Sequence, residues 1–286
     1  MKKTFRYLLV IMLLFSFCGV ASGKNRSPLI KAVSTGKIDT VKKLIEEGCD
    51  LNTRDAHEKT ALIWASVQGR NEIVKELLKA GADIELKDNF GCNALMWAVW
   101  GRRTETVGLL VDAGADVNVK HDVDGRTALS EAAVNGCADI VELLIAGGAD
   151  VNSMGKAGIT PLMEAAGGGR TDTVMKLVKA GADLCLRDNN GYTALLCAVL
   201  KDKAGTVKAL IEAGAKIDLK DNTNNTALDY ARMMNKGEIV TMLENSDAIE
   251  QANREEDLRL QQENERLKRL VSELKGELGK AHQAKR

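Results

Sequence analysis

Several residue types are scarce in this sequence of 286 residues, and their scarcity narrows the classes of function. It has three histidines, His57, His121 and His282, and none forms a metal-ligand motif with a cysteine or a second histidine. Neither a G-x-S-x-G motif nor a Walker glycine loop occurs. The 40 basic and 40 acidic side chains cancel, so the basic footprint of a nucleic-acid-binding protein is missing. We therefore expect a protein that is not an enzyme and has no cofactor, metal site or nucleic-acid partner.

Proline and aromatic residues are scarce as well. The chain has two prolines and 3% aromatic residues, whereas 45% of its residues are hydrophobic. Because proline interrupts helices, this composition favours a helix-rich protein with a sizeable aliphatic core. Five cysteines follow Cys18 without any C-x-x-C motif, and we interpret them as packing residues and not as a disulfide framework. They are Cys49, Cys92, Cys137, Cys185 and Cys197.

What the sequence has in abundance is a repeated pattern. Thr-Ala-Leu-x-x-Ala or a close variant recurs every 33 residues, with one step of 34, and most copies lead into Gly-Ala-Asp. A fixed period of this length indicates a solenoid, in which each repeat buries its apolar face by stacking on its neighbours. Repeats 1 to 7 begin at Ser27, Thr60, Asn93, Thr127, Thr160, Thr193 and Thr226.

Repeat 2 shows how the pattern specifies structure. Thr60 is a good N-cap for a short helix that Gly69 ends. A second helix follows up to Gly81, and residues 88–91 have the composition of a tight turn. Each repeat is thus predicted to be helix, turn, helix and β-turn. The predicted buried stripe of the second helix consists of Ile73, Val74, Leu77 and Leu78.

These repeats resemble ankyrin repeats over roughly residues 27 to 245. The family pattern T-P-L-H-x-A followed by G-A-D is closely approached by Thr160-Pro161-Leu162 with Gly181-Ala182-Asp183. The resemblance implies an all-α ankyrin-repeat solenoid of about seven helix-turn-helix units with β-hairpin turns, and a C-terminal helix in addition. The family's histidine is absent from every copy. One extra residue lies between Lys120 and Gly125, and we expect it to lengthen that hairpin turn without disturbing the stack.

The same resemblance implies where a partner would bind. In ankyrin proteins the first helix of each unit and the hairpin tips line a concave binding face. Aromatic residues and arginine dominate protein–protein binding energy, so large side chains at these places are candidate partner contacts, although packing against an adjacent hairpin would also explain them. The candidates are Phe90, Trp100, Arg126, Ile159 and Tyr192. Trp64 and Trp97 are instead expected in the core.

Residues 1–23 have the order of a secretory signal. Lys2, Lys3 and Arg6 precede an apolar run, and the small residues 21–23 follow it. The run is short of the ~20 residues that span a bilayer. We expect cleavage near Gly23, a periplasmic destination and no membrane insertion afterwards. A lipid anchor at Cys18 and an uncleaved signal anchor are the alternatives.

Residues 247–286 lack the repeat pattern. Leu260, Leu267 and Leu274 are spaced by seven and take the d positions of a heptad, with Asn264, Val271 and Leu278 at a positions. This pattern predicts a coiled-coil helix and a homodimer, because a single Asn at a typically fixes two-stranded register. A solvated single helix is the alternative.

The sequence therefore predicts a signal peptide (1–23), an ankyrin repeat domain (24–246) and a coiled-coil helix (247–286). The predicted function is an exported protein–protein interaction scaffold that binds a partner through the concave face, for example a periplasmic enzyme. The alternative is a structural protein of the cell envelope whose coiled coil binds the partner. Hydrolytic or redox activity is the least favoured hypothesis.

Overall fold

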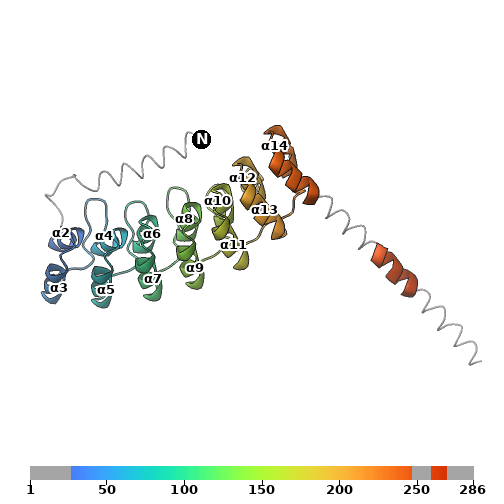
Figure 1. Ribbon diagram of the computed structural model, residues 1–286. Helices are drawn as coiled ribbons and strands as arrows, with labels where there is room; N and C mark the ends of the chain where they lie inside the picture. Colours follow the sequence, from blue (N-terminus) through green and yellow to red (C-terminus); the bar gives the residue numbers. More distant parts are fainter. Residues whose placement is uncertain (1–26, 247–258, 269–286) are drawn as a thin grey trace, which may run out of the picture. The chain divides into compact units, whose positions relative to one another are not determined.

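The computed structural model describes residues 27–246 and 259–268 (Figure 1). Within these ranges the chain forms helices and turns without a β-strand, and one isolated β-bridge joins Lys120 to Thr127. The expected all-α architecture is confirmed. The hairpins between repeats are turns that carry no ladder of strand hydrogen bonds in the described part of the chain.

Each repeat contributes two short helices. The first helices are α2 (Pro28–Thr35), α4 (Ala61–Gln68), α6 (Ala94–Trp100), α8 (Ala128–Asn135), α10 (Pro161–Gly167), α12 (Ala194–Leu200) and α14 (Ala227–Met233). The second helices are α3 (Ile38–Glu46), α5 (Asn71–Lys79), α7 (Thr104–Asp112), α9 (Ala138–Ala146), α11 (Thr171–Lys179) and α13 (Ala204–Glu212). Residues 237–246 and 259–268 are also helical.

Local signals set the ends of these helices. The Thr60 hydroxyl oxygen accepts a hydrogen bond from the Ile63 backbone N–H at 3.3 Å, as expected for an N-cap. Gly69 ends α4 in the left-handed region with φ of 69°, where a residue with a Cβ would be strained. Helices of 7 to 9 residues are too short to be stable alone. They depend on stacking.

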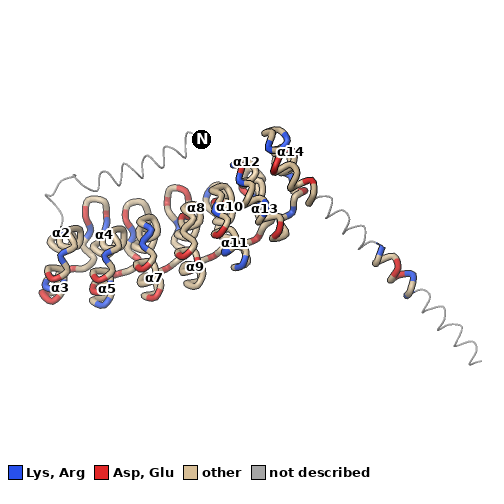
Figure 2. The backbone as a smooth tube through the Cα atoms, in the orientation of Figure 1, with Lys and Arg blue, Asp and Glu red and all other residues tan. Residues whose placement is uncertain are grey.

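The two helices of a repeat are buried to different extents. Every residue of α4 from Ala61 to Val67 is buried, whereas α5 buries only Ile73, Val74 and Leu77. Helix α4 packs against α2 and α6, and α5 packs against α3 and α7. Within the N-terminal body the first helices α2, α4, α6 and α8 are therefore the more buried layer, and the second helices α3, α5, α7 and α9 the more exposed one. Lys, Arg, Asp and Glu gather at the turns and on the second helices (Figure 2).

The chain divides into two compact bodies. Residues 27–165 with 172–183 form the N-terminal body, and residues 166–171 with the described residues from 184 onward form the C-terminal body.

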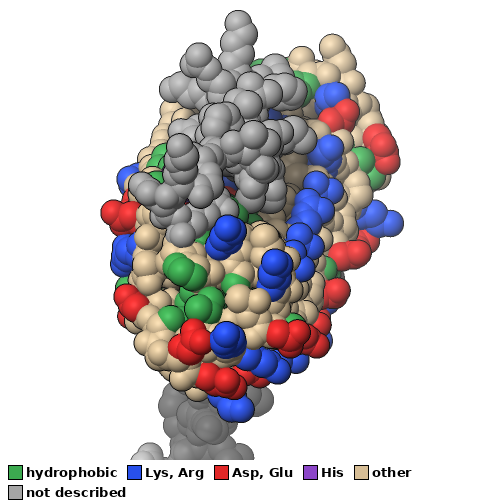
Figure 3. Space-filling model, turned by 90° about the vertical axis from the view of Figure 1, so that its left-hand side faces the viewer, with side chains coloured by type: hydrophobic (Ala, Val, Ile, Leu, Met, Phe, Trp, Pro, Cys, Tyr) green, Lys and Arg blue, Asp and Glu red, His purple; other side chains and the backbone are tan. Residues whose placement is uncertain are grey.

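Charged side chains surround a small apolar patch on the face of the molecule that Figure 3 turns toward the viewer. A polar outer face of this kind is what the end of a repeat array needs.

The hairpin with the extra residue is longer than the others. In the hairpins that end repeats 1 and 2, the closing hydrogen bond joins residues four apart, from the Asp55 N–H to the Lys59 carbonyl and from the Asp88 N–H to the Cys92 carbonyl. In the longer hairpin the closing hydrogen bond joins residues five apart, from the His121 N–H to the Arg126 carbonyl at 2.8 Å. The expected lengthening is confirmed.

Among the helices in residues 27–246 and 259–268, none has the length and apolar character that crossing a membrane requires.

Candidate functional site

Two positions recur in every repeat and come together on the hairpin side of the first helices. One is the residue just before the Thr, Ser or Asn that opens each repeat, and the other lies four residues after that opening residue. The first is occupied by the last residue of repeats 1 to 6, namely Lys59, Cys92, Arg126, Ile159, Tyr192 and Asn225. The second is Lys31, Trp64, Trp97, Glu131, Glu164, Cys197 and Tyr230 in repeats 1 to 7. In the N-terminal body, Lys59 contacts Trp64 and Trp97, and Arg126 contacts Glu131 and Glu164, so that each of these two residues contacts the second position of two successive first helices.

In repeats 2 and 3 this arrangement builds an aromatic cluster. Asp55 and Asp88 close their hairpins and also accept hydrogen bonds from the indole N–H groups of Trp64 and Trp97, at 2.9 and 2.8 Å. These bonds fix the two rings, which are only 4% and 5% exposed. The Lys59 ammonium lies 3.4 Å from the ring centroid of Trp97 and 5.3 Å from that of Trp64. It therefore makes a cation–π contact that bridges two repeats.

Trp100 continues the cluster toward repeat 4. Its ring meets that of Trp97 edge to face at a centroid distance of 4.8 Å, and that of His121 at 5.6 Å. The side chain is partly exposed. Its indole N–H is buried without a hydrogen-bond partner in the described part of the chain. A buried donor without a partner costs free energy, so Trp100 is held here by its ring contacts.

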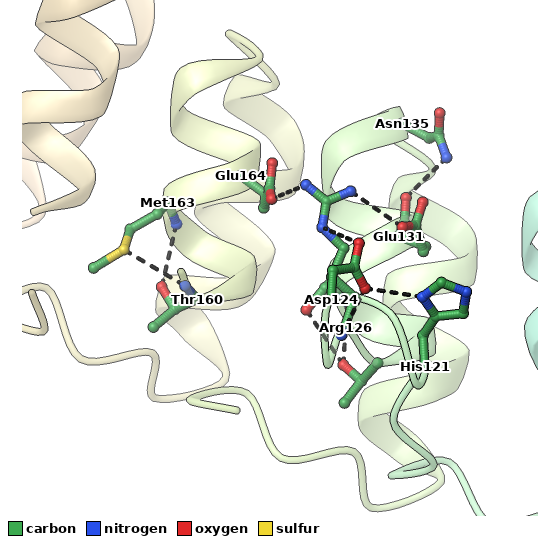
Figure 4. A network of polar contacts seen from close by, with 10 residues as sticks. His121, Asp124, Arg126, Glu131, Asn135, Thr160, Met163 and Glu164 are labelled. Carbon is green, nitrogen blue, oxygen red and sulfur yellow. Dashed lines mark hydrogen bonds and ion pairs between the residues drawn. The ribbon is translucent and has the colours of Figure 1, made fainter. Parts of the chain in front are cut away.

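Arg126 links repeat 4 to repeat 5 through three carboxylates (Figure 4). Its guanidinium donates to Glu131 at 3.1 Å and to Glu164, and its Nε lies 3.7 Å from an oxygen of Asp124. The side chains of Glu131 and Glu164 are only 12% and 13% exposed. Asp124 in turn contacts His121 Nδ1 at 3.0 Å. One arginine thus joins two first helices and a hairpin, facing three carboxylates.

Burial and charge move the pKa values of this network. Burial raises the pKa of Glu164 above its usual value, although the bond from Arg126 opposes the shift. Burial would also raise the pKa of Asp124, but hydrogen bonds from His121 and from the Arg126 backbone N–H outweigh it and lower that pKa. For Arg126, burial opposes ionisation while Glu164 and Glu131 favour it, and the net effect is a raised pKa. The arginine remains charged.

These contacts form one continuous chain of side chains across repeats 2 to 5, within the N-terminal body. We call it the Trp–Arg row. It consists of Lys59, Trp64, Trp97, Trp100, His121, Asp124, Arg126, Glu131 and Glu164. Each member contacts at least one other through a hydrogen bond, an ion pair or a ring contact: Lys59 contacts both Trp64 and Trp97, and Arg126 pairs with both Glu131 and Glu164.

The candidates predicted from the sequence are placed differently from what we expected. All five are partly buried and none is fully exposed. Trp100 and Arg126 belong to the Trp–Arg row, and Ile159 holds the first recurring position at the end of repeat 4. Phe90 lies two residues before Cys92, in the hairpin that precedes α6. Its carbonyl accepts a hydrogen bond from the Asp122 N–H at 3.2 Å. The predicted core positions of Trp64 and Trp97 are confirmed.

Tyr192 belongs to the C-terminal body. Its ring meets Tyr230 edge to face at 6.2 Å, and the hydrogen bond with Tyr230 raises the pKa of Tyr192 to about 12. Tyr230 also donates to Asp221 at 2.7 Å, as the tryptophans do to their hairpin aspartates. The contact between a hairpin aspartate and an aromatic side chain of the following first helix thus recurs here, with Tyr in place of Trp.

Lys59 is the contact that sequence reasoning missed. Its spacing from Arg126 and Tyr192 was visible, because all three precede the N-cap Thr of their repeats. Glu131 and Glu164 lie one period apart in the sequence, but only the structure shows that they share Arg126 as a partner. Among residues 27–246 and 259–268, no group of three or more His, Cys, Asp or Glu side chains is arranged to hold a metal ion.

The predicted coiled-coil residues are only partly covered. Leu260, Asn264 and Leu267 lie in the helix at 259–268, whereas Val271, Leu274 and Leu278 fall outside the described residues. The predicted signal peptide also lies outside them.

Comparisons with known proteins agree with the repeat geometry. A family model described as ankyrin repeats in three copies matches residues 5–88, 72–155 and 162–253. The solved ankyrin repeat domain of Bcl-3, described as a unique member of the IkappaB protein family, is 27% identical with a TM-score of 0.70, over 77% of this chain and 99% of that one. The human ASB11 ankyrin repeat domain is 25% identical with a TM-score of 0.67, over 77% of this chain and 98% of that one. No curated protein matches the sequence. The family model covers most of the sequence, so this chain belongs to the ankyrin repeat family.

Proposed function

We propose that this protein binds a protein partner through the hairpin side of its first helices, with the Trp–Arg row at the centre of the contact. Ankyrin repeats generally act as protein–protein interaction modules, and this chain shares their fold. The observation that carries the proposal is the continuous row of tryptophan and charged side chains across repeats 2 to 5. Tryptophan and arginine are the residues that most often dominate binding energy.

The partly exposed members of the row suggest how a partner would gain affinity. Trp100 retains exposed ring surface beside a buried and unpaired N–H. Arg126 is already paired with Glu131 and Glu164, so its role is to hold two first helices in register under the partner. Covering Trp100 removes apolar surface from water at little entropic cost, because the ring is already fixed by Trp97 and His121.

Site-specific photo-crosslinking tests this surface. A photoreactive phenylalanine analogue at Phe90 or Ile159 should capture the same protein in the native cell, and Trp100→Ala should reduce the yield. The matched control carries the analogue at Lys43 on α3, a second helix, where the side chain is 75% exposed. Equal capture from Lys43 would contradict the proposal, and so would capture that ignores Trp100→Ala.

We also propose that the protein is exported to the periplasm, where an enzyme of that compartment is one class of partner. The support is the charged, apolar and small-residue order of residues 1–23. N-terminal sequencing should find a mature chain that begins between Ala21 and Lys24 in the soluble periplasmic fraction. An acylated Cys18 or an intact Met1 in membranes would contradict export in this form.

A final part of the proposal is dimerisation through the C-terminal helix. Leu260 and Leu267 lie one heptad apart in the helix at 259–268, and their side chains are 57% and 51% exposed. A second copy would cover them. The full chain should sediment as a dimer and a chain ending at Ser246 as a monomer, while Asn264→Leu should strengthen association and loosen its two-stranded specificity. A full chain that stays monomeric at all concentrations would rule this out.

The alternative function is an envelope assembly protein that captures its partner through the coiled coil. It predicts that the chain ending at Ser246 loses the partner, whereas binding through the Trp–Arg row predicts that this chain retains it. The photo-crosslinking experiment on the shortened chain separates the two.

A further inference from the structure

A third recurring position carries basic residues in six of the seven repeats. It is the residue just before each second helix. In the N-terminal body it is Lys37, Arg70 and Arg103 in repeats 1 to 3, and Cys137 interrupts the series. Figure 2 shows basic residues at the turns between α2 and α3, α4 and α5, and α6 and α7. In Figure 3 Lys and Arg side chains line up in a row on the surface. We call Lys37, Arg70 and Arg103 the basic row.

The first helix of the preceding repeat holds two of these side chains in place. Gly36 leaves room for the guanidinium of Arg70, and Gly69 for the side chain of Arg103. Arg103 Nε also donates to the Val67 carbonyl at 3.2 Å, at the C-terminal end of α4. A cation is favourable at this negative end of a helix. The packing explains the position of the arginines but uses only one of the five N–H donors of Arg103.

The charges of the basic row are not neutralised. Nearby lysines on the second helices form ion pairs, Lys42 with Glu76 at 4.0 Å and Lys75 with Glu105 at 3.6 Å. No carboxylate in residues 27–246 or 259–268 pairs with Lys37, Arg70 or Arg103, and all three residues are exposed. Helices α3, α5 and α7 start beside them without a side-chain cap. The positive ends of these helices add to the local potential.

The row is also narrow. Asp39, Glu72 and Glu105 follow two residues after its members, and all three are exposed. A flat anionic membrane or a nucleic-acid duplex would contact these three carboxylates as well as the basic row, and the carboxylates would repel it. A single extended polypeptide can lie along the basic row alone. Charge complementarity therefore favours an acidic peptide segment.

The spacing of the repeats sets the spacing of charges on such a segment. Packed helices lie about 8–10 Å apart, and a polyproline II segment advances about 3.1 Å per residue with three residues per turn. Three residues of peptide therefore match one repeat, and side chains three apart point to the same side of the peptide.

We propose that the basic row is a second interaction surface, which binds an extended acidic segment of a protein with carboxylates three residues apart. It is distinct from the Trp–Arg row and does not depend on it. The probe is a fluorescent (Glu-Pro-Pro)4 peptide, measured by anisotropy with the full chain at 50 mM and 200 mM salt. A peptide of the same composition with its four Glu clustered at one end is the control for spacing.

The triple variant Lys37→Gln, Arg70→Gln, Arg103→Gln should bind the peptide about tenfold more weakly, since three charge pairs are lost. The matched control neutralises Lys42, Lys43 and Lys75, which are also exposed but already paired. It should bind within about twofold of the unmodified chain, because its lysines lie outside the row. The double variant Arg70→Lys, Arg103→Lys should retain binding because it keeps the charges. Lys37→Glu alone should weaken binding, and it tests the row even if the triple variant fails to fold.

Several results would overturn the proposal. These are an equal loss in the control triple, equal binding of the clustered peptide, and unchanged affinity in Lys37→Glu. Tighter binding of duplex DNA or of anionic phosphatidylglycerol vesicles than of the peptide would assign the row to another class of partner. Binding that does not weaken between 50 and 200 mM salt would show that charge is not its cause.

Discussion

Arg126 offers the sharpest test of how the repeats are held together. Arg126→Met keeps the aliphatic stem and removes the charge, so that Glu131 and Glu164 lose their shared partner while remaining nearly buried. Removing one partner of a buried ion pair costs roughly 3–5 kcal/mol. Arg126 itself is 27% exposed, and water can partly replace it. We therefore expect a loss of about 2–4 kcal/mol at neutral pH.

The same reasoning predicts a dependence on pH. A raised pKa means that folded Glu164 binds a proton more readily than unfolded Glu164 does. Its ionisation therefore lowers stability as pH rises from its unfolded value of about 4.3 through its folded pKa. Without Arg126 the folded pKa rises further, so the defect of Arg126→Met should shrink as the pH is lowered from 7 to 5. Adding Glu164→Gln should remove part of the defect at pH 7.

Urea unfolding followed by far-ultraviolet circular dichroism measures these changes. Arg102→Met is the control, because Arg102 is exposed and, among residues 27–246 and 259–268, its side chain bonds only to the neutral amide of Asn135. It should change stability by no more than about 0.5 kcal/mol. Our account of the network would be refuted if Arg126→Met matched this control. It would also be refuted if the defect were the same at pH 5 and pH 7.

Three further predictions concern the scaffold. Asp88→Asn should lower stability by about 1–3 kcal/mol, because the buried carboxylate accepts from two backbone N–H groups and an indole N–H; a melt unchanged from that of the parent would show that these bonds are not needed. Gly205→Ala, in helix α13 with open space around it, should stabilise by about 0.5–1 kcal/mol, whereas Gly69→Ala should destabilise because φ is 69° and Arg103 lies in the way; equal effects in thermal melts would contradict this. Exposed Cys185 should react with a thiol reagent in the native protein well before buried Cys92, whose pKa is raised chiefly by burial, and the order of labelling by mass spectrometry checks this.

The periodic sequence determined the fold. The N-cap at Thr60, Gly69 at the helix end and the apolar stripe of α5 are local signals, and each acts within a few residues of itself. Of the four residues predicted in that stripe, Ile73, Val74 and Leu77 are buried and Leu78 is half-buried. Repetition at 33 residues then requires every repeat to stack in the same way. The extra residue near Lys120 was equally readable, because a hairpin can absorb an insertion without moving the helices on either side. Export and dimerisation remain predictions, since no contact in the described residues tests them.

The site depended on tertiary structure. Arg126 and Glu164 are 38 residues apart, and nothing local chooses between Glu164 and another carboxylate as its partner. The stacking of repeats 4 and 5 makes that choice, because it brings the hairpin that carries Arg126 beside both first helices, α8 with Glu131 and α10 with Glu164. The same stacking packs the Trp100 ring against Trp97 and His121, whereas the sequence had suggested that this side chain is exposed. Burial of a side chain at the surface of a solenoid is set by the residue one repeat away, and a single repeat does not contain that residue.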